Sequence, residues 1–322
     1  MSKYSATARS HPNIALIKYW GKRDILLNLP AVPSLSLTLS KFHTTTTVNW
    51  GSKEDQLVLN GSVQDRAGNA ATKVFDFLNL IDSQRPPCKV ISENNFPTAA
   101  GLASSASAFS ALAMAGCAAA EIPYSSETLS VFARRGSGSA SRSIFDGWVE
   151  WRMGERDDGL DSHGVQLAPA NHWDVRMVMA VVSEKQKPIS SRAGMMDTQR
   201  TSPMYRAWCQ TANTDLEIAK SALYNRDLDR LGTQMEHSTL KMFSTMFTTM
   251  PSIRYWKPQT IALMEAVERL RQGGLSCYYT MDAGPNVKVL CHAQDAAEIA
   301  DALKHIVHTV HILEPGNGTH LI

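Results

Sequence analysis

The sequence predicts an α+β fold built from two domains. Its 322 residues exceed the usual length of a single domain. Segments of strand and helix character also follow one another without the strict alternation that a doubly wound parallel sheet requires. The second half is mainly helical and closes with strands around one helix. We therefore expect mixed sheets packed with helices, in domains at residues 1–172 and 173–322.

Composition excludes several classes of function. Hydrophobic residues make up 43% of the chain and charged residues 19%, which is typical of a globular protein with a sizeable core. The net charge of +2 provides no basic field for nucleic acid. No apolar run is long enough to span a membrane, and the first residues lack the apolar segment of a secretion signal. We expect a cytoplasmic protein that binds neither nucleic acid nor a membrane.

The first half is expected to begin with strands. Residues 3–20 read as extended, and Pro12 limits their pairing. Leucine alternates with serine or threonine over residues 35–40, which predicts a half-buried strand. The threonine-rich residues 43–50 also favour a strand.

A hairpin and two helices are expected next. Asn60-Gly61 marks a tight turn between a strand at 56–59 and a short return strand. An apolar stripe at helical spacing predicts a helix over residues 67–82. The remaining expected elements of this half are a helix near 126–134, an aromatic strand at 148–151 and a polar surface loop at 155–163.

The second half opens with a continuous apolar run at residues 175–182, which fits a buried strand. Long helices follow, and the chain then returns to strands. The predicted ranges are helices at 204–224, 226–248, 257–272 and 295–306, and strands at 276–281, 286–291 and 308–313.

The stretch at residues 97–110 separates an extended segment from a small-residue helix that runs to Ala120. A tight loop before a helix leaves backbone N–H groups unpaired at the positive end of the helix dipole, where phosphate binds readily. Ser104 and Ser105 can cap this helix or turn their hydroxyls to a phosphate or a metal ion. A capped core helix after an ordinary turn explains the same residues equally well, because the chain has neither G-x-x-x-x-G-K-S/T nor G-x-G-x-x-G.

A second segment rich in glycine and serine spans residues 134–143 and includes Arg134, Arg135 and Arg142. A flexible linker has a similar composition, but linkers rarely sit so close to both a helix and an aromatic strand. A second anion-binding loop is therefore the favoured interpretation.

Three further stretches carry chemical groups. Residues 11–24 interleave basic and aromatic side chains, residues 187–192 place cations and hydroxyls after a buried strand, and residues 280–286 place Asp282 before a Gly-Pro turn. Each alone has an ordinary explanation, namely a basic surface strand, a solvated loop and a turn-capping aspartate. Together with two anion loops, they form an inventory that suits phosphoryl transfer onto an acidic substrate.

These motifs closely resemble those of the mevalonate diphosphate decarboxylases, a family of the GHMP kinase superfamily. The resemblance is carried by Asn-Ile-Ala at 13–15, Lys-Tyr-Trp-Gly-Lys-Arg-Asp at 18–24, the phosphate loop at 94–106, the Gly/Ser segment at 136–143 and Asp-Ala-Gly-Pro-Asn at 282–286. The segment at 18–24 separates this family from other GHMP kinases. The resemblance implies a GHMP-kinase-like two-domain fold with the active site in the cleft between the domains.

The resemblance also implies an activity. Members of the family carry out the ATP-dependent decarboxylation of (R)-5-diphosphomevalonate to isopentenyl diphosphate, with release of ADP, phosphate and CO₂, in the mevalonate pathway of isoprenoid biosynthesis. They phosphorylate the tertiary 3-hydroxyl, and loss of that phosphate drives the departure of CO₂. ATP and Mg²⁺ are therefore the expected cofactors, and a homodimer is the expected assembly.

Carried over residue by residue, the resemblance assigns roles to three groups of side chains. As catalytic residues it implies Asp282, which faces the hydroxyl, Lys18 beside it, and Arg142, which holds the substrate carboxylate. As substrate-binding residues it implies Tyr19, Trp20, Gly21, Lys22, Ser137, Gly138, Ser139, Ala140, Ser141, Arg142 and Arg192. As ATP-binding residues it implies Pro97, Ala100, Gly101, Leu102, Ala103, Ser104, Ser105, Lys187 and Ser191, with Ser105 also a candidate Mg²⁺ ligand and Arg66 a further possible substrate contact.

A physical expectation follows for the catalytic carboxylate. A lysine within about 4–6 Å of Asp282 lowers the pKa of that carboxyl, which makes it a weak base at neutral pH. A loose phosphoryl-transfer transition state requires little early proton removal. We therefore expect Asp282 to orient the hydroxyl and to take its proton late, while Lys18 helps to neutralise the transferring phosphoryl group.

Two alternatives stay open from the sequence. A sister enzyme would phosphorylate a mevalonate-type substrate at the 3-position without decarboxylation, or would accept the monophosphate. A non-catalytic binding protein of the same fold would be expected to have lost the carboxylate or the phosphate loop, and this chain retains both.

Overall fold

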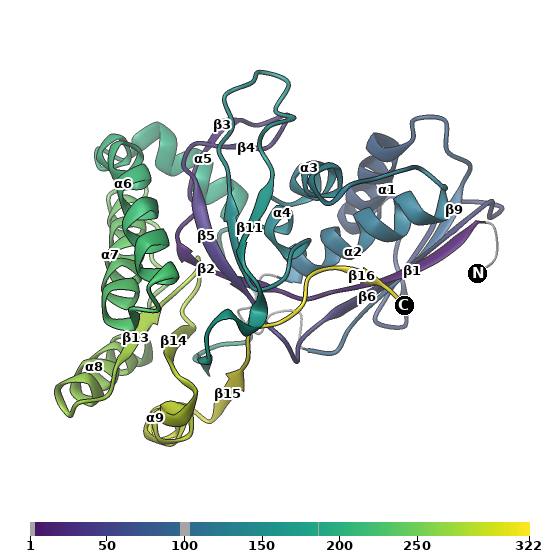
Figure 1. Ribbon diagram of the computed structural model, residues 1–322. Coiled ribbons are helices and arrows are strands. Elements are labelled where there is room, and N and C mark those ends of the chain that lie inside the picture. Colours follow the sequence, from purple (N-terminus) through teal and green to yellow (C-terminus); the bar gives the residue numbers. More distant parts are fainter. Residues whose placement is uncertain (1–3, 97–103, 186) are drawn as a thin grey trace.

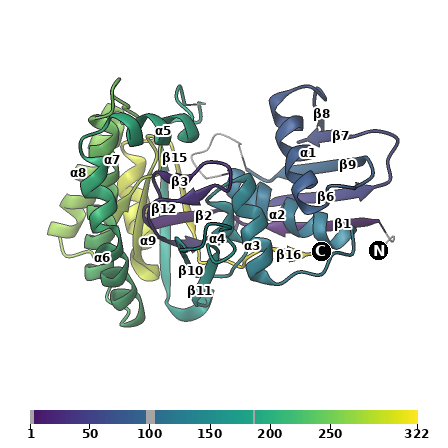
Figure 2. The same cartoon turned by 90° about the horizontal axis from the view of Figure 1, so that it is seen from above.

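The structure is a computed structural model that describes residues 4–96, 104–185 and 187–322. Within these ranges the strands form sheets of six, four, four and two strands, and helices pack around them. This arrangement confirms the α+β prediction. Figures 1 and 2 show the helices of the second half grouped on one side and the largest sheet of the first half on the other.

The six-stranded sheet has the order β16-β1-β6-β9-β7-β8. Strand β7 runs parallel to β9, and the other neighbours are antiparallel. The last strand of the chain pairs with the first, so β16 and β1 lie side by side (Figure 1). The strands are β1 (Ser5–Ser10), β6 (Thr44–Trp50), β7 (Gln56–Leu59), β8 (Ser62–Val63), β9 (Cys88–Asn94) and β16 (His320–Leu321).

Three helices form a layer beside this sheet: α1 (Asn69–Ile81), α2 (Ser104–Ala119) and α3 (Ser126–Gly136). Helix α2 lies directly on β1 and β6, and the other two helices pack against it. Its alanine-rich sequence explains this position, because small side chains allow the helix backbone to approach the sheet closely. Thr44 of β6 contacts Asn94 at the end of β9 at 2.6 Å and Ser107 near the start of α2 at 2.7 Å, so the N-terminus of α2 lies close to the end of β9.

A four-stranded sheet of order β11-β10-β5-β2 connects the two halves. The prediction of a half-buried strand at residues 35–40 was wrong, because every residue of β5 is buried. Leu35 and Leu37 enter a hydrophobic core that also contains Met177 and Leu216 from the second half. The residues that alternate with these leucines, Ser34, Ser36 and Thr38, are polar and also buried. The alternation therefore distinguishes an apolar face of β5 from a polar face, and both faces are buried. The strands are β2 (Asn13–Ile17), β5 (Ser34–Thr38), β10 (Trp148–Trp151) and β11 (Gly164–Ala168), of which β11 was not predicted.

The third sheet, β13-β14-β12-β15, belongs to the second half and is antiparallel throughout. Its strands are β12 (Val175–Val181), β13 (Cys277–Thr280), β14 (Val287–His292) and β15 (Thr309–Leu313). Its helices are α5 (Ser191–Thr201), α6 (Tyr205–Tyr224), α7 (Leu228–Phe247), α8 (Pro258–Gln272) and α9 (Ala296–Lys304). The smaller elements of the chain are β3 (Lys22–Asp24), β4 (Leu29–Pro30), α4 (Ala140–Ser143), η1 (Ala170–His172) and η2 (Ala293–Asp295).

The predicted boundary near residue 172 lies in η1, between the second and third sheets. The core around Leu35 crosses this point, so the two halves pack as neighbours along a continuous apolar contact. The boundary itself stays a prediction. Among the described residues, none of the helices combines the length and the apolar character needed to cross a membrane.

Candidate active site

Asp282 lies two residues after the end of β13, and two lysines contact its carboxylate. Lys18 Nζ lies 3.1 Å from Oδ1, and Lys288 Nζ lies 3.3 Å from Oδ2. The two lysine side chains are only 1% and 2% exposed, whereas that of Asp282 keeps 32% of its surface accessible. The two buried lysines therefore bind the carboxylate on its interior side, and its other side is accessible to solvent.

The fold brings these three residues together from distant parts of the chain. Lys18 follows β2, where its backbone N–H donates to Ser238 Oγ on α7 at 3.0 Å. Lys288 lies on β14, opposite Thr280 of β13. Because Thr280 ends its strand, the side chain of Lys288 is placed close to the carboxylate that follows.

The charges in this cluster influence each other strongly. Although burial raises the pKa of the Asp282 carboxyl, the charges of Lys18 and Lys288 and the hydrogen bonds they donate hold it well below its usual range. Burial lowers the pKa of Lys18 to about 8, against the opposing effect of Asp282. At neutral pH the carboxylate is thus ionised, and Lys18 is mostly protonated but titrates at mildly alkaline pH.

Arg142 lies on the short helix α4, where its guanidinium is fixed by two polar side chains. Nε donates to Asn13 Oδ1 at 3.2 Å, and Nη1 donates to Ser34 Oγ at 2.7 Å. The guanidinium carbon lies 5.8 Å from the ring centre of Trp151. Burial lowers the pKa of Arg142 to about 10, so the group stays charged at neutral pH. Within the described ranges, Nη2 is the guanidinium nitrogen without a protein acceptor, which leaves it for an acidic ligand.

Tyr19 connects Arg142 with a second arginine. Its ring packs edge-on against Trp151, with centroids 4.7 Å apart. Burial raises the pKa of the Tyr19 hydroxyl, and the charges of Arg142 and Arg192 oppose this effect. The charge of Arg192 also acts on Lys22, whose pKa is lowered to about 8, mainly by burial. The structure thus brings four of the predicted substrate-binding side chains into one electrostatic neighbourhood.

The predicted Gly/Ser loop at 134–143 is shorter than expected. Helix α3 continues to Gly136, and Ala140–Ser143 forms a helical turn, so only residues 137–139 connect them. Ala140 and Ser141 are fully buried, and Ser141 Oγ donates to the carbonyl of Gly138 at 2.8 Å. These two residues support the loop from inside.

The three connecting residues face other predicted site residues. Ser137 Oγ lies 3.1 Å from Ser105 Oγ at the start of α2, and 3.3 Å from Ser139 Oγ. A Cβ atom at Gly138 would lie 2.9 Å from the Tyr19 hydroxyl, so only glycine allows this close approach. The predicted ATP loop and the predicted substrate loop are therefore in contact.

Arg134 has a different role from the anion contact that its position suggested. Its side chain is fully buried and donates to the backbone carbonyls of Leu27 and Gly159 at 3.1 and 2.7 Å, and to that of Ser162. These carbonyls occupy the guanidinium, so Arg134 stabilises the surrounding loops.

Lys187 and Ser191 lie beside the carboxylate cluster. Lys187 Nζ donates to Ser191 Oγ at 2.6 Å and to the carbonyl of Ala283, the residue after Asp282, at 3.1 Å. Burial lowers the pKa of Lys187, and the charge of Asp282 opposes this effect. The predicted exit loop at 187–192 ends in helix α5, which begins at Ser191 and is capped by Ser190.

Trp20 and Gly21 are placed differently from their neighbours. The side chain of Trp20 is 1% exposed and belongs to the core of the second half, so only its backbone is left for a ligand. Its carbonyl already accepts from Trp208 Nε1 at 3.0 Å. Gly21 has a φ of 103° and lies against Tyr205, which excludes a larger residue.

Five predicted ATP contacts, namely Pro97, Ala100, Gly101, Leu102 and Ala103, lie outside the described residues. Ser104 and Ser105 begin α2, as predicted. In the described part of the chain, His, Cys, Asp and Glu side chains form no cluster of three that could hold a metal ion. A hydroxyl such as that of Ser105 fits Mg²⁺ that is held mostly by phosphates and water.

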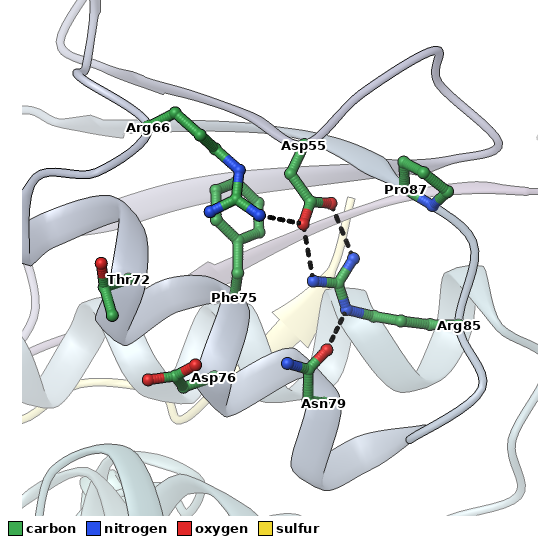
Figure 3. A pocket seen from close by; sticks show the side chains of 8 residues that line it. All are labelled: Asp55, Arg66, Thr72, Phe75, Asp76, Asn79, Arg85 and Pro87. Atoms are coloured by element: carbon green, nitrogen blue, oxygen red, sulfur yellow. Dashed lines mark hydrogen bonds and ion pairs between the residues drawn. The ribbon is translucent and has the colours of Figure 1, made fainter.

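A pocket of about 300 Å³ lies elsewhere in the first half, and Arg66 lines it (Figure 3). Arg85 contacts both carboxylate oxygens of Asp55, at 2.7 and 3.0 Å, and Arg66 contacts the same carboxylate at 3.1 Å. The charges in this pocket are therefore largely paired. Among the described residues, none of those that contact Asp282 lines the pocket, and the substrate contact suggested for Arg66 stays a prediction.

Sequence reasoning missed three residues of the site: Asn13 as the support of Arg142, Ser34 beside it, and Lys288. A signal for Lys288 was present, because it is the single charged residue within the apolar strand 287–291. A lysine in a buried strand requires a partner. Asp282, only six positions earlier, was a candidate for that partner.

The chain is similar to known proteins over most of its length. Residues 10–164 match the family model of the diphosphomevalonate decarboxylase-like N-terminal domain, and residues 177–317 match that of the mevalonate 5-diphosphate decarboxylase C-terminal domain. The diphosphomevalonate decarboxylase of Gibberella zeae is 39% identical over 93% of this chain and 84% of its own length. That of Bos taurus is 36% identical over 93% and 80%.

Solved structures are similar over nearly the whole chain. Mevalonate diphosphate decarboxylase from Staphylococcus aureus superposes with a TM-score of 0.93 at 38% identity and covers 99% of this chain and 98% of its own. MDDEF in complex with MVAPP, AMPPCP and magnesium gives a TM-score of 0.92 at 40% identity, with 99% of both chains covered. On these matches, and on the two family models that together span most of the sequence, the chain belongs to the diphosphomevalonate decarboxylase family.

Proposed function

We propose that this chain catalyses the ATP-dependent decarboxylation of diphosphomevalonate to isopentenyl diphosphate, with release of ADP, phosphate and CO₂. The observation that carries the proposal is the placement of Asp282, Lys18 and Arg142 in one electrostatic cluster. Membership of the family supplies the substrate, since MDDEF was solved with MVAPP and the ATP analogue AMPPCP.

Asp282 is the group that orients the 3-hydroxyl of the substrate. Its carboxylate is ionised and partly accessible, so it can accept a hydrogen bond from that hydroxyl. Its low pKa makes it a poor base, which suits a loose transition state in which the proton leaves late. The hydroxyl oxygen forms a bond to the γ-phosphorus while the bond to ADP breaks, and Asp282 receives the proton.

Lys18 supplies positive charge beside this step. Its ammonium is fully buried and is already fixed by Asp282 and by the carbonyl of Ala15 at 2.7 Å. A charge that is positioned before the reaction stabilises developing negative charge without further reorganisation. We assign Lys18 to neutralise the transferring phosphoryl group.

Arg142 is the group for the substrate carboxylate. A guanidinium binds a carboxylate with two parallel hydrogen bonds, which fixes its plane as well as its position. In the second step the bond to the carboxylate carbon breaks, its electron pair forms the new C=C bond, and the 3-phosphate leaves with the electrons of its C–O bond. Arg142, held by Asn13 and Ser34, keeps the carboxylate aligned until CO₂ departs.

The nucleotide is assigned to the start of α2 and the residues around it. When bound, ATP supplies the phosphoryl group, and Mg²⁺ neutralises phosphate charge. The described side chains that we assign to this ligand are Ser104 and Ser105 at the helix N-terminus, and Lys187 and Ser191 beside Asp282. These residues suit ATP because hydroxyl and ammonium groups donate hydrogen bonds to phosphate oxygens.

We further propose that the protein is a cytoplasmic homodimer. Both parts of this proposal rest on the resemblance to the family and on the expectations from the sequence. Light scattering coupled to gel filtration would measure the assembly directly. A mass near the 35.4 kDa of one chain would overturn the dimer.

The activity is tested by measuring CO₂ and ADP from ATP with each of three acceptors: mevalonate, its monophosphate and its diphosphate. We expect CO₂, ADP and isopentenyl diphosphate in equal amounts from the diphosphate. ADP without CO₂ would indicate a 3-kinase, and faster turnover of the monophosphate would indicate the other sister enzyme. Binding of both ligands without turnover would indicate a non-catalytic protein.

A further inference from the structure

Lys288 is a buried charge that the proposed mechanism does not yet use. It lies on β14 between Val287 and Val289, and its side chain is 2% exposed. Removing an ammonium from water is costly, and a hydrophobic residue is often at least as stable as a buried ion pair at such a place. Packing alone therefore does not account for a lysine within this strand.

The contact that accounts for it is the one with Asp282. Lys288 Nζ lies 3.3 Å from Oδ2, and Lys18 Nζ lies 3.1 Å from Oδ1, so each carboxylate oxygen has its own ammonium. One ammonium would leave the carboxylate free to rotate about its last torsion, which is broad for aspartate. Two ammoniums, one from the residue after β2 and one from β14, hold the plane of the carboxylate.

We infer that Lys288 is a positioning residue that holds Asp282 in the orientation and the ionised state required for the reaction. This inference rests on the proposed catalytic role of Asp282. Lys288 acts through the carboxylate, and Lys18 remains the ammonium assigned to the phosphoryl group.

The charge balance of the cluster gives Lys288 a second effect. With both lysines protonated, the three groups carry a net charge of +1, and Lys187 and Arg142 add positive charge around them. Once Asp282 has accepted the substrate proton, the same three groups carry +2. Lys288 therefore disfavours early transfer of the proton and favours its release after the reaction.

The test begins with two neutral variants. Lys288→Met keeps most of the length of the side chain and removes the charge, and Lys288→Gln also removes the charge but retains a hydrogen-bond donor. We expect kcat to fall about 10- to 100-fold, as a misplaced reacting group does, with little change in KM. We also expect the acid limb of the kcat profile to move up by roughly 1–3 pH units, because the carboxyl loses one of its two cations. Lys288→Arg should retain most of the parent kcat and most of the parent position of the acid limb. Lys89→Met, on β9, is the control for loss of a lysine charge on a strand away from the site.

A double variant separates this inference from the proposed function. If Lys288 acts through the carboxylate, adding Lys288→Met to Asp282→Asn should leave the residual kcat unchanged, since effects on one unit are not additive. Three results would overturn the role of Lys288. One is that Lys288→Met lowers kcat as much in the Asp282→Asn background as it does in the parent. The others are an unchanged acid limb and a normal kcat in both Lys288→Met and Lys288→Gln. A normal kcat for Asp282→Asn alone would instead overturn the proposed role of Asp282. Thermal melting of each variant confirms that folded protein is being compared.

Discussion

Lys18 Nζ lies 3.1 Å from Oδ1 of Asp282, although 264 positions separate the two residues in the sequence. The ammonium is almost fully withdrawn from solvent, so the carboxylate and the carbonyl of Ala15 take the place of water around it. Each group therefore sets the protonation of the other. This coupling decides what several substitutions and changes of pH should do.

Replacing Asp282 with asparagine should remove turnover and spare binding. The amide keeps the shape of the side chain but can neither accept the proton nor balance Lys18. We expect kcat to fall by about 10³-fold, within the range for loss of a proton-transfer group. Calorimetric titration should find nucleotide and substrate affinities within a few-fold of the parent, as for the exposed control Asp157→Asn. A comparable loss of affinity would indicate a structural role instead.

The pH dependence of kcat should have an alkaline limb set by Lys18. Since burial lowers the pKa of Lys18 to about 8, the ammonium is present below that pH and is lost as the pH rises through it. The rate should fall accordingly. Lys18→Arg keeps its charge over the whole range and should move the limb upward, whatever its absolute rate. A parent kcat that stays level well above pH 8 would contradict this assignment.

Lys22 provides a control for that experiment. Burial and the charge of Arg192 lower its pKa to about 8 as well. We assign Lys22 to substrate binding, so its titration belongs to kcat/KM and not to kcat. Lys22→Arg should therefore shift only the limb of kcat/KM.

Much of the site could be predicted because its residues lie in contiguous motifs. Lys18 and Asp282 lie in the loops that follow β2 and β13, where functional groups are often presented, and Arg142 lies on the short helix α4. The alternation of residue types over 35–40 correctly indicated a strand, but its burial could not be derived. The polar face of β5 is satisfied by distant partners, as when Ser34 accepts a hydrogen bond from Arg142, more than a hundred positions away.

The parts that were missed depend on pairing between distant segments. Lys288 becomes meaningful only when β14 pairs with β13 and brings it to Asp282. Strand β11 has polar flanks and acquires its place by pairing with β10. The helical turn at Ala140–Ser143 was read as loop because its serines favour turns locally, whereas burial against α2 and α3 stabilises it as a helix.

Replacing Arg142 with lysine should weaken binding and alignment of the substrate carboxylate, although the positive charge is kept. A lysine cannot hold Asn13 and Ser34 and also form a two-pronged pair with a carboxylate. We expect kcat/KM to fall by roughly 10- to 100-fold, since a charged hydrogen bond is worth about 1.5–3 kcal/mol. The exposed Arg152→Lys is the control. Turnover equal to that of the parent would exclude bidentate recognition.

The paired charges of the pocket in Figure 3 should contribute to stability and not to catalysis. The side chains of Asp55 and Arg85 are 11% and 6% exposed, and Asp55 also accepts from the backbone N–H of Cys88 at 3.0 Å. Asp55→Asn removes the charge that Arg85 requires, which should lower the free energy of unfolding by about 2–3 kcal/mol. Urea unfolding measures this loss, and kcat should stay at the parent value.

The same substitution has a pH signature. Burial raises the pKa of Asp55, but the hydrogen bonds from Arg85 and Cys88 outweigh it and hold the pKa below its ordinary value. The stabilisation is therefore complete above the ordinary aspartate pKa and is lost as the pH falls through the lowered one. The parent and Asp55→Asn should converge in acid, whereas Asp158→Asn, which breaks an exposed pair with Arg156, should differ from the parent much less at any pH. A constant difference between parent and Asp55→Asn down to strongly acid pH would show that packing, and not the charge of Asp55, stabilises this region.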